Sequence, residues 1–248
     1  MTDVDLVEVV VAHQECATLR VGGMFLKVDG DQARAVVEVE AMRMAPVPTP
    51  EVLWHRPPVL ALAALPGSAL GRLGRPSLAP PATWAAVGAA VRRLHDSRLP
   101  PWPGRSLDES ASRLDAACAW LLSNDVLPAD LVARNRRLAE TALRPCTPAF
   151  THGDLQVEHV FVDGEEVTGI LDWTEAGQGD PMHDLAVLTL GNRDRLGDLA
   201  AGYGRALDVE VIRAWWSVRC LTAIRWLVEH GFDPYQPGCE IDVLRAQT

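Results

Sequence analysis

The sequence has few cysteines, and their arrangement excludes two common kinds of site. The five cysteines are an odd number, lie far apart, and include no Cys-x-x-Cys pair. This pattern argues against a disulfide framework and against a zinc site, and it favours a reducing compartment. The first residues, Met1 to Asp5, contain no basic segment. We therefore expect no signal peptide and a cytoplasmic location.

Positive charge is also scarce. The chain has 23 basic and 33 acidic residues, which give a formal net charge of −10. This balance argues against a nucleic-acid partner, because such proteins present a basic surface. No apolar run is longer than 59–65, which is far shorter than the ~20 residues that span a bilayer. We expect neither nucleic acid nor membrane as a partner, and nothing in the sequence indicates the oligomeric state.

The pattern of apolar residues divides the sequence into two unlike parts. The first 65 residues alternate short apolar runs with turn signals, and from Pro81 onward helical periodicity dominates. The sequence predicts an α+β protein with a small antiparallel β-rich part at 1–65 and a larger, mainly helical part at 66–248. The junction is expected at about 62–67. Expected strands are 6–12, 17–21, 24–28, 52–54, 59–65, 160–162 and 167–171; expected helices are 31–44, 83–95 (capped by Thr83), 106–122, 128–143, 185–190, 196–206 and 209–230.

Two aspartates follow short apolar runs in the middle of the chain. Asp154 stands in Thr151-His152-Gly153-Asp154, and Asp172 ends the run Ile170-Leu171-Asp172-Trp173. Each alone is a common turn residue. Together, carboxylates at neighbouring strand ends can divide work, one orienting or deprotonating a hydroxyl and the other holding a divalent cation.

A lysine on an early strand is the third candidate. Lys27 lies in Met24-Phe25-Leu26-Lys27-Val28, and the following helix offers Glu38 and Glu40 as partners. Glu38 is preferred because Met42 and Ala45 follow it at helical spacing. The functional interpretation of Lys27 is a phosphate-binding ammonium, and the alternative is an exposed strand lysine.

These motifs resemble the aminoglycoside phosphotransferase-like family, which has a protein-kinase-like two-lobed fold. The resemblance is strongest in three motifs that occur in the family's order and spacing over about 35 residues. They are His152-Gly153-Asp154, Ile170-Leu171-Asp172-Trp173 and Gly179-Asp180-Pro181-x-x-Asp184-Leu185-Ala186. Weaker matches extend upstream as far as Lys27.

The resemblance implies a role for each residue in an ATP-dependent transfer of a phosphoryl group to a small-molecule hydroxyl. Asp154 would face the acceptor hydroxyl, Asp172 would bind the magnesium ion on the phosphates, and Lys27, paired with Glu38, would contact the phosphates. In the hinge between the two lobes, backbone groups of Ala63 and Leu65 would meet the adenine edge, and Leu62 would stand behind it. His152 and Asp184 would support the catalytic loop.

The sequence departs from the family in two places. His159 stands where the family usually has an asparagine metal ligand. His159 could bind a metal such as manganese or contact the metal through a water. Alternatively, Asp172 could hold the metal, with Gln156 or Glu158 in place of the asparagine. No Gly-x-Gly-x-x-Gly precedes Lys27, and the turn 13–16 is the candidate for covering the phosphates.

The acceptor and the reaction class remain open at this point. The family builds its acceptor site from the C-terminal helices, whose aromatic and acidic residues here suit a cationic or polyhydroxyl molecule such as an aminoglycoside, an amino alcohol or a sugar. One alternative is a metal-dependent hydrolase, and another is a catalytically weak nucleotide-binding regulatory module. The hydrolase would use as ligands His152, Asp154, His159, Asp163 and Asp172.

Overall fold

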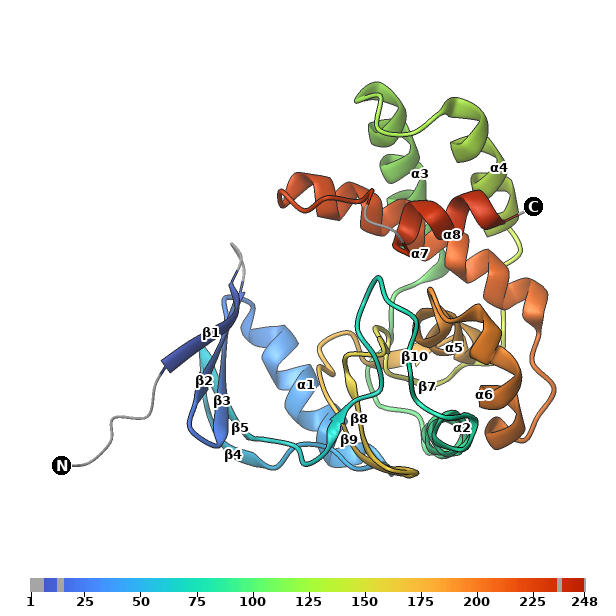
Figure 1. Ribbon diagram of the computed structural model, residues 1–248. Coiled ribbons are helices and arrows are strands. Elements are labelled where there is room, and N and C mark those ends of the chain that lie inside the picture. The colour runs from blue at the N-terminus through green and yellow to red at the C-terminus, as the bar shows by residue number, and fades with distance from the viewer. Residues whose placement is uncertain (1–6, 13–15, 236–237, 248) are drawn as a thin grey trace.

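Two unlike parts lie side by side in the computed structural model, which describes residues 7–12, 16–235 and 238–247 (Figure 1). The N-terminal part is a five-stranded antiparallel sheet in the order β1-β2-β3-β5-β4 with one helix, α1, packed beside it. The elements are β1 (Val7–Ala12), β2 (Cys16–Val21), β3 (Met24–Asp29), α1 (Gln32–Met44), β4 (Val52–Arg56) and β5 (Val59–Ala63).

The C-terminal part is mainly helical and contains two small sheets, β6-β8-β9 and β7-β10. Its strands are β6 (Ser68–Ala69), β7 (Ala149–Thr151), β8 (Val160–Asp163), β9 (Glu166–Ile170) and β10 (Gly177–Gly179). Its helices are α2 (Pro81–His95), α3 (Leu107–Ser123), α4 (Ala129–Ala139), α5 (Pro181–Thr189), the 3₁₀ turn η1 (Arg193–Arg195), α6 (Leu196–Tyr203), α7 (Val209–Glu229) and α8 (Glu240–Ala246). The α+β class and the division into a β-rich and a helical part are confirmed.

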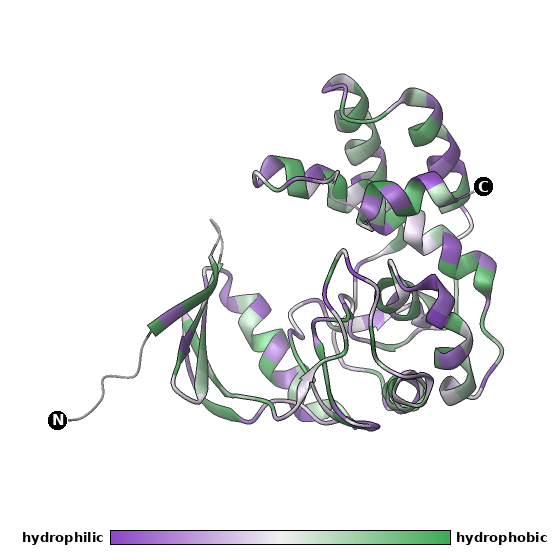
Figure 2. Ribbon diagram, in the orientation of Figure 1, coloured by the Kyte–Doolittle hydropathy of each residue, from purple (hydrophilic) through white to green (hydrophobic). Residues whose placement is uncertain are grey.

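The core lies mainly in the larger part, around the small sheets. Trp84, Phe150 and Trp173 are fully buried there and are joined by aliphatic residues of α2, α5 and α7. Figure 2 shows hydrophobic and hydrophilic residues alternating along the helices, as expected when each helix packs one face inward. This packing fixes β7, β8 and β9, and so fixes the loops that follow them.

Two of the connections between the parts are made by the backbone. After β5 the chain passes through Gly67, whose φ of +84° only glycine adopts at low cost; a Cβ there would lie 2.3 Å from the Val162 carbonyl oxygen. The Ile170 N–H of β9 donates a 2.9 Å hydrogen bond to the Pro48 carbonyl, which precedes β4. The small sheets of the larger part therefore hold both connections.

Some expected boundaries were wrong. Helix α2 begins at Pro81, not at Thr83, and the Thr83 hydroxyl donates instead to the Gly164 carbonyl at 2.8 Å. Helix α4 ends at Ala139, well before residue 143, and α5 begins at Pro181 behind the capping side chain of Asp180. At α2 a tertiary contact engages the expected cap, Thr83, whereas the start of α5 is set by the local cap of Asp180. Residues 13–15 of the expected phosphate-covering turn lie outside the described residues.

Candidate active site

The loop after β7 carries His152, Gly153 and Asp154. Gly153 has φ +84°, and a Cβ there would lie 2.1 Å from the Glu175 carbonyl oxygen, so the position requires glycine. From α5, the Asp184 carboxylate accepts hydrogen bonds from the N–H groups of His152 at 2.7 Å and Gly153 at 2.9 Å. The loop is thereby fixed from the side of the core.

Asp184 is itself held in a buried network. His95 Nε2–H donates to its carboxylate at 3.0 Å, and His95 Nδ1 is 3.0 Å from the Tyr203 hydroxyl. Burial alone would raise the pKa of Asp184, but the hydrogen bond and charge of His95 outweigh it and the pKa is lowered. Asp184 is therefore an ionised support that does not face the open site.

The His152 side chain is also a support. It is fully buried, and its Nε2–H donates to the Leu171 carbonyl at 2.8 Å, so the catalytic loop is tied to the residue before Asp172. Burial lowers the pKa of His152, which keeps the ring neutral. A neutral, engaged imidazole is unsuited to metal binding through Nε2.

Lys27 joins the two parts of the molecule. Its ammonium lies 2.7 and 2.9 Å from the two Glu38 oxygens of α1 and 2.9 Å from Asp172 Oδ1. Burial alone would lower the pKa of Lys27, but the carboxylates of Asp172 and Glu38 outweigh it and raise the pKa. Glu40, the alternative partner, pairs with Arg43 on the exposed side of α1 instead.

Asp172 has a strained backbone. Its φ of +61° is in the left-handed region, which costs a non-glycine residue about 1–2 kcal/mol and which clusters at functional sites. Burial would raise its pKa, but Lys27, and then His159, outweigh burial and lower it. The side chain is therefore an ionised carboxylate aimed at the space between the two parts.

Asp154 is held by two side chains. Gln156 Nε2 donates to its Oδ2 at 2.8 Å, and a guanidinium nitrogen of Arg219, on α7, lies 3.2 Å from its Oδ1. Burial would raise the pKa of Asp154, but Arg219 and then His159 outweigh it and lower the pKa. Sequence reasoning missed Arg219 because no local motif connects a helix near the C-terminus with the catalytic loop.

His159 has the orientation of a metal-binding histidine. Its Nδ1–H donates to the Asp154 carbonyl at 2.8 Å, so in the neutral ring the Nε2 lone pair is bare, and Nε2 lies 3.8 Å from Asp172 Oδ2. Metal-bound histidines commonly donate their other N–H to a carbonyl in this way. The Nε2 atom and the Asp172 carboxylate fit a shared divalent cation. Glu158 points elsewhere and accepts from the Leu73 N–H at 3.1 Å.

The residues expected at the hinge lie at the end of β5 and just after it. Leu62 is buried, and the Ala63 N–H donates to the Glu51 carbonyl at 3.0 Å. Among the described residues the Leu65 N–H has no hydrogen-bond acceptor, and the Leu65 side chain packs on Gly169 of β9. The segment expected to form the hinge thus keeps one backbone donor, the Leu65 N–H, without an acceptor among the described residues.

The proposed hydrolase ligands do not converge. Within the described ranges, no group of three or more histidine, cysteine, aspartate or glutamate side chains is placed to hold a metal ion. Asp163 is exposed at the turn between β8 and β9. His152 is occupied by Leu171. The arrangement has one carboxylate–imidazole pair, which is too few ligands for a protein-only metal centre.

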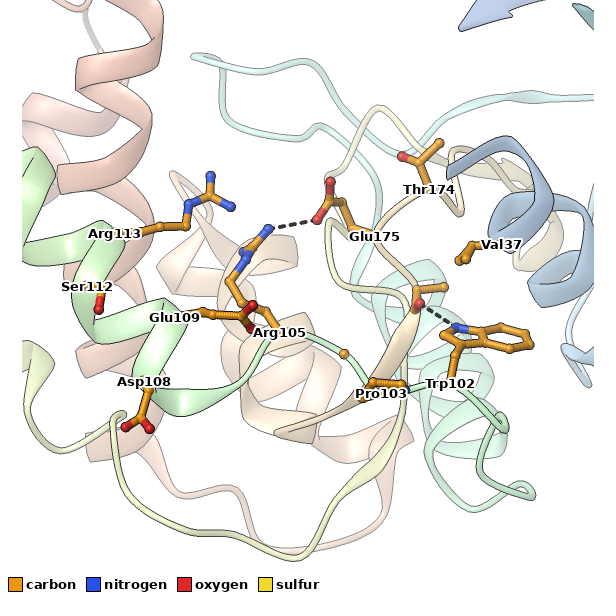
Figure 3. Close-up of a pocket in the computed structure, with 12 residues that line it drawn as sticks. Val37, Trp102, Pro103, Arg105, Asp108, Glu109, Ser112, Arg113, Thr174 and Glu175 are labelled. Atoms are coloured by element: carbon orange, nitrogen blue, oxygen red, sulfur yellow. Dashed lines mark hydrogen bonds and ion pairs between the residues drawn. The ribbon is translucent and has the colours of Figure 1, made fainter. Parts of the chain in front are cut away.

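A pocket of about 650 Å³ opens beside the catalytic loop (Figure 3). Its walls come from α1, the segment before α3, the first turns of α3, and residues 174–176 after Asp172. Within it, Glu175 binds Arg105 at 2.8 Å, and Glu175 also lies 3.3 Å from Arg34 of α1. Sequence reasoning singled out none of these three residues.

No helix in the described part of the chain has both the length and the apolar character to span a membrane.

The chain is similar to known small-molecule kinases in sequence. Streptomycin 3''-kinase of Streptomyces griseus is 32% identical over 209 residues, which are 71% of this chain and 74% of that kinase. Viomycin phosphotransferase of Streptomyces vinaceus is 31% identical over 145 residues, which are 53% of this chain and 50% of that enzyme. Both relatives are phosphotransferases of antibiotics by name.

Solved structures of phosphotransferases are also similar to this chain. An aminoglycoside phosphotransferase of Streptomyces rimosus, in complex with ADP and streptomycin, is 27% identical with a TM-score of 0.63, covering 87% of this chain and 92% of that one. The GDP complex of aminoglycoside 2'-phosphotransferase-IIIa has a TM-score of 0.73 at 16% identity over 99% and 93% of the two chains, and shows the fold alone. The sequence pattern of the phosphotransferase enzyme family matches residues 28–219. The chain therefore belongs to the phosphotransferase enzyme family and is a small-molecule kinase with the expected two-part fold.

Proposed function

We propose that the chain transfers the γ-phosphoryl group of ATP to a hydroxyl of a small molecule, with Asp154 as the base and Asp172 as the metal ligand. The observation that carries the proposal is Lys27, which lies between Glu38 and Asp172. A buried lysine shared by a helix carboxylate and a strained aspartate is the arrangement that positions nucleotide phosphates. Transfer needs little covalent chemistry beyond such positioning.

The nucleotide would bind between lobes at 1–65 and 66–248, with the hinge at about 62–67. The free N–H of Leu65 and the backbone of Ala63 would meet the adenine edge, and Leu62 would stand behind it. Lys27 would exchange its contact with Asp172 for the phosphates. The complex of the Streptomyces rimosus phosphotransferase with ADP supports a nucleotide as the phosphoryl donor.

Mg²⁺, or Mn²⁺ in its place, would neutralise charge on the phosphates when bound. Asp172 and His159 would hold it, because Asp172 Oδ2 and the bare His159 Nε2 face each other at 3.8 Å. Two protein ligands suffice where phosphate oxygens and waters complete the coordination. Imidazole suits manganese better than magnesium.

Asp154 would accept the proton of the acceptor hydroxyl. Its lowered pKa leaves it ionised at neutral pH, and a weak base is adequate because in a loose transition state the hydroxyl loses its proton late. Its carboxylate is held by Gln156 and Arg219. The names of the relatives support an aminoglycoside-like, amino-alcohol or sugar acceptor.

The test is a comparison of binding and transfer in the parent and in Asp154→Asn. We expect calorimetry to show ATP binding with magnesium or manganese in both proteins, and phosphoryl transfer in the parent alone. Lys27→Ala should weaken ATP binding. An absence of saturable ATP binding with either metal would contradict the proposal, and binding without transfer to any acceptor would favour the regulatory-module alternative.

A further inference from the structure

The two carboxylate oxygens of Asp172 have different neighbours. The Thr174 hydroxyl donates to Oδ1 at 3.0 Å, and the Lys27 ammonium binds the same oxygen at 2.9 Å. The other oxygen, Oδ2, lies 3.8 Å from His159 Nε2. The two donors on Oδ1 hold the carboxylate in an orientation in which Oδ2 faces the imidazole.

The main chain alone does not set this orientation. Strand β9 ends at Ile170, and Asp172 lies beyond it with φ +61°. A side chain beyond the end of a strand lacks the cross-strand neighbours that fix a side chain within a sheet. The direction of the Asp172 carboxylate therefore depends on the hydrogen bonds that it accepts.

The two donors come from different parts of the molecule. Lys27 lies on β3, in the smaller part. Thr174 lies two residues after Asp172 in the larger part, in a segment that is fixed where Trp102 Nε1–H donates to the Ala176 carbonyl at 2.9 Å. A movement of one part relative to the other would thus change the contact of Asp172 with Lys27 and preserve its contact with Thr174.

The two donors also differ in charge. The Lys27 ammonium at Oδ1 would repel a divalent cation at Oδ2, whereas the Thr174 hydroxyl is neutral. In the proposed function, Lys27 leaves Asp172 for the nucleotide phosphates. Among the hydrogen bonds of the described residues, the one from Thr174 then remains on Oδ1. Asp172 would keep its orientation while its negative charge becomes available to the cation.

We propose that Thr174 is a positioning residue for phosphoryl transfer, whose hydroxyl keeps Oδ2 of Asp172 directed at the metal site beside His159 after Lys27 has turned to the phosphates. The inference rests on the proposed function, which assigns the metal to Asp172 and gives Thr174 no role. Thr174 is half-buried and lines the pocket together with Val37 of α1 (Figure 3). The alternative is that the Thr174 methyl group only fills space there.

Two substitutions separate the hydroxyl from the methyl group. Thr174→Val keeps the shape of the side chain and removes the donor, whereas Thr174→Ser keeps the donor and removes the methyl group. Electron paramagnetic resonance of free Mn²⁺ measures the affinity for Mn²⁺ at saturating ADP. We expect Thr174→Val to weaken Mn²⁺ binding about tenfold and Thr174→Ser to bind Mn²⁺ like the parent. Parent-like affinity in Thr174→Val, or equally weak binding in both variants, would overturn the proposal.

Binding of ADP without metal tests whether the effect is confined to the metal ligand. In EDTA we expect the parent and both Thr174 variants to bind ADP with the same Kd. Thr189→Val is the matched control, because it removes a buried hydroxyl that donates to the Leu185 carbonyl at 2.6 Å within α5, and it should change neither affinity. An equal loss of Mn²⁺ affinity in Thr174→Val and Thr189→Val would contradict the assignment.

Failure of the proposed function would have a different signature. If the parent binds neither ADP nor Mn²⁺ in the presence of ADP, the nucleotide site itself is wrong and the role of Thr174 falls with it. If the parent binds both and Thr174→Val binds Mn²⁺ equally well, only the role of Thr174 is wrong.

Discussion

The Arg34 guanidinium of α1 lies 3.3 Å from the carboxylate of Glu175, three residues after Asp172. Arg34 and Glu38 are one helical turn apart and so share a face of α1. Glu38 binds Lys27, and Lys27 binds Asp172. The helix and the segment 172–175 are therefore joined by two ion-pair connections, one at the nucleotide side and one at the pocket side.

Glu175→Gln should reduce activity with little effect on stability. The Glu175 side chain is 36% exposed, and exposed ion pairs contribute only about 0–1 kcal/mol each. Its loss would remove one of the two connections between α1 and the segment that carries Asp172, and misplaced phosphates slow transfer, so we expect kcat to fall about tenfold. Steady-state kinetics and a melting curve measure the two effects.

Glu40→Gln is the matched control for Glu175→Gln. It removes the exposed pair with Arg43 on the other side of α1 and should leave kcat and Tm nearly unchanged. If Glu175→Gln and Glu40→Gln have the same kcat, the Arg34–Glu175 pair does not position the site.

Lys27→Met should destabilise the protein strongly. Glu38 is 2% exposed, and without Lys27 its buried charge loses its counterion, which costs about 3–5 kcal/mol. The double variant Lys27→Met/Glu38→Gln should recover part of this loss because position 38 no longer carries an unpaired buried charge. Urea unfolding of the parent, both single variants and the double variant gives the coupling energy. Additive changes would show that the pair is not coupled.

Arg219→Gln should move the acid limb of kcat/KM to higher pH. Burial raises the pKa of Asp154, and Arg219 is the strongest of the charges that lower it. Without that charge the pKa rises, so the ionised base is lost as pH falls through a higher value. In the parent, Asp154 should stay ionised down to below about pH 3.9, the ordinary value for aspartate.

Steady-state rates across about pH 4 to 8 should show an acid limb in Arg219→Gln at pH values where the parent still keeps its full rate. Arg225→Gln, which breaks an exposed pair with Glu229 on the same helix, is the control and should keep the parent's profile. An unchanged acid limb in Arg219→Gln would mean that Arg219 does not govern the ionisation of Asp154.

His159→Asn should change the metal preference. The bare Nε2 of His159 beside Asp172 favours manganese, whereas an amide oxygen favours magnesium. We expect the ratio of Mn²⁺ to Mg²⁺ affinity, measured by calorimetry with ADP, to fall about tenfold, or about 1.4 kcal/mol. Nitrogen hyperfine coupling to bound Mn²⁺ should be present in the parent and lost in the variant. Coupling that is equal in both proteins would exclude His159 as a ligand.

Much of the fold could be predicted because its elements are written in local patterns. Gly22-Gly23 between apolar runs gave the β2–β3 hairpin, and Asp31 gave the start of α1, where its side chain accepts from the Ala33 and Arg34 N–H groups. Thr83 shows the limit of such patterns. It is a good capping residue by type, but the neighbouring β8–β9 turn offers it the Gly164 carbonyl and the helix begins earlier.

The sequence by itself determined which chemical groups the site can use: two carboxylates in loops that follow short strands, a lysine on a strand with a glutamate on the next helix, and a histidine in place of an amide. It could not determine their geometry. The ion pair of Lys27 with Asp172, the direction of the His159 ring, and the approach of Arg219 to Asp154 join residues far apart along the chain. Only the packing of the two parts and of α7 brings these residues together, because distances between remote residues depend on the whole core and not on any local pattern.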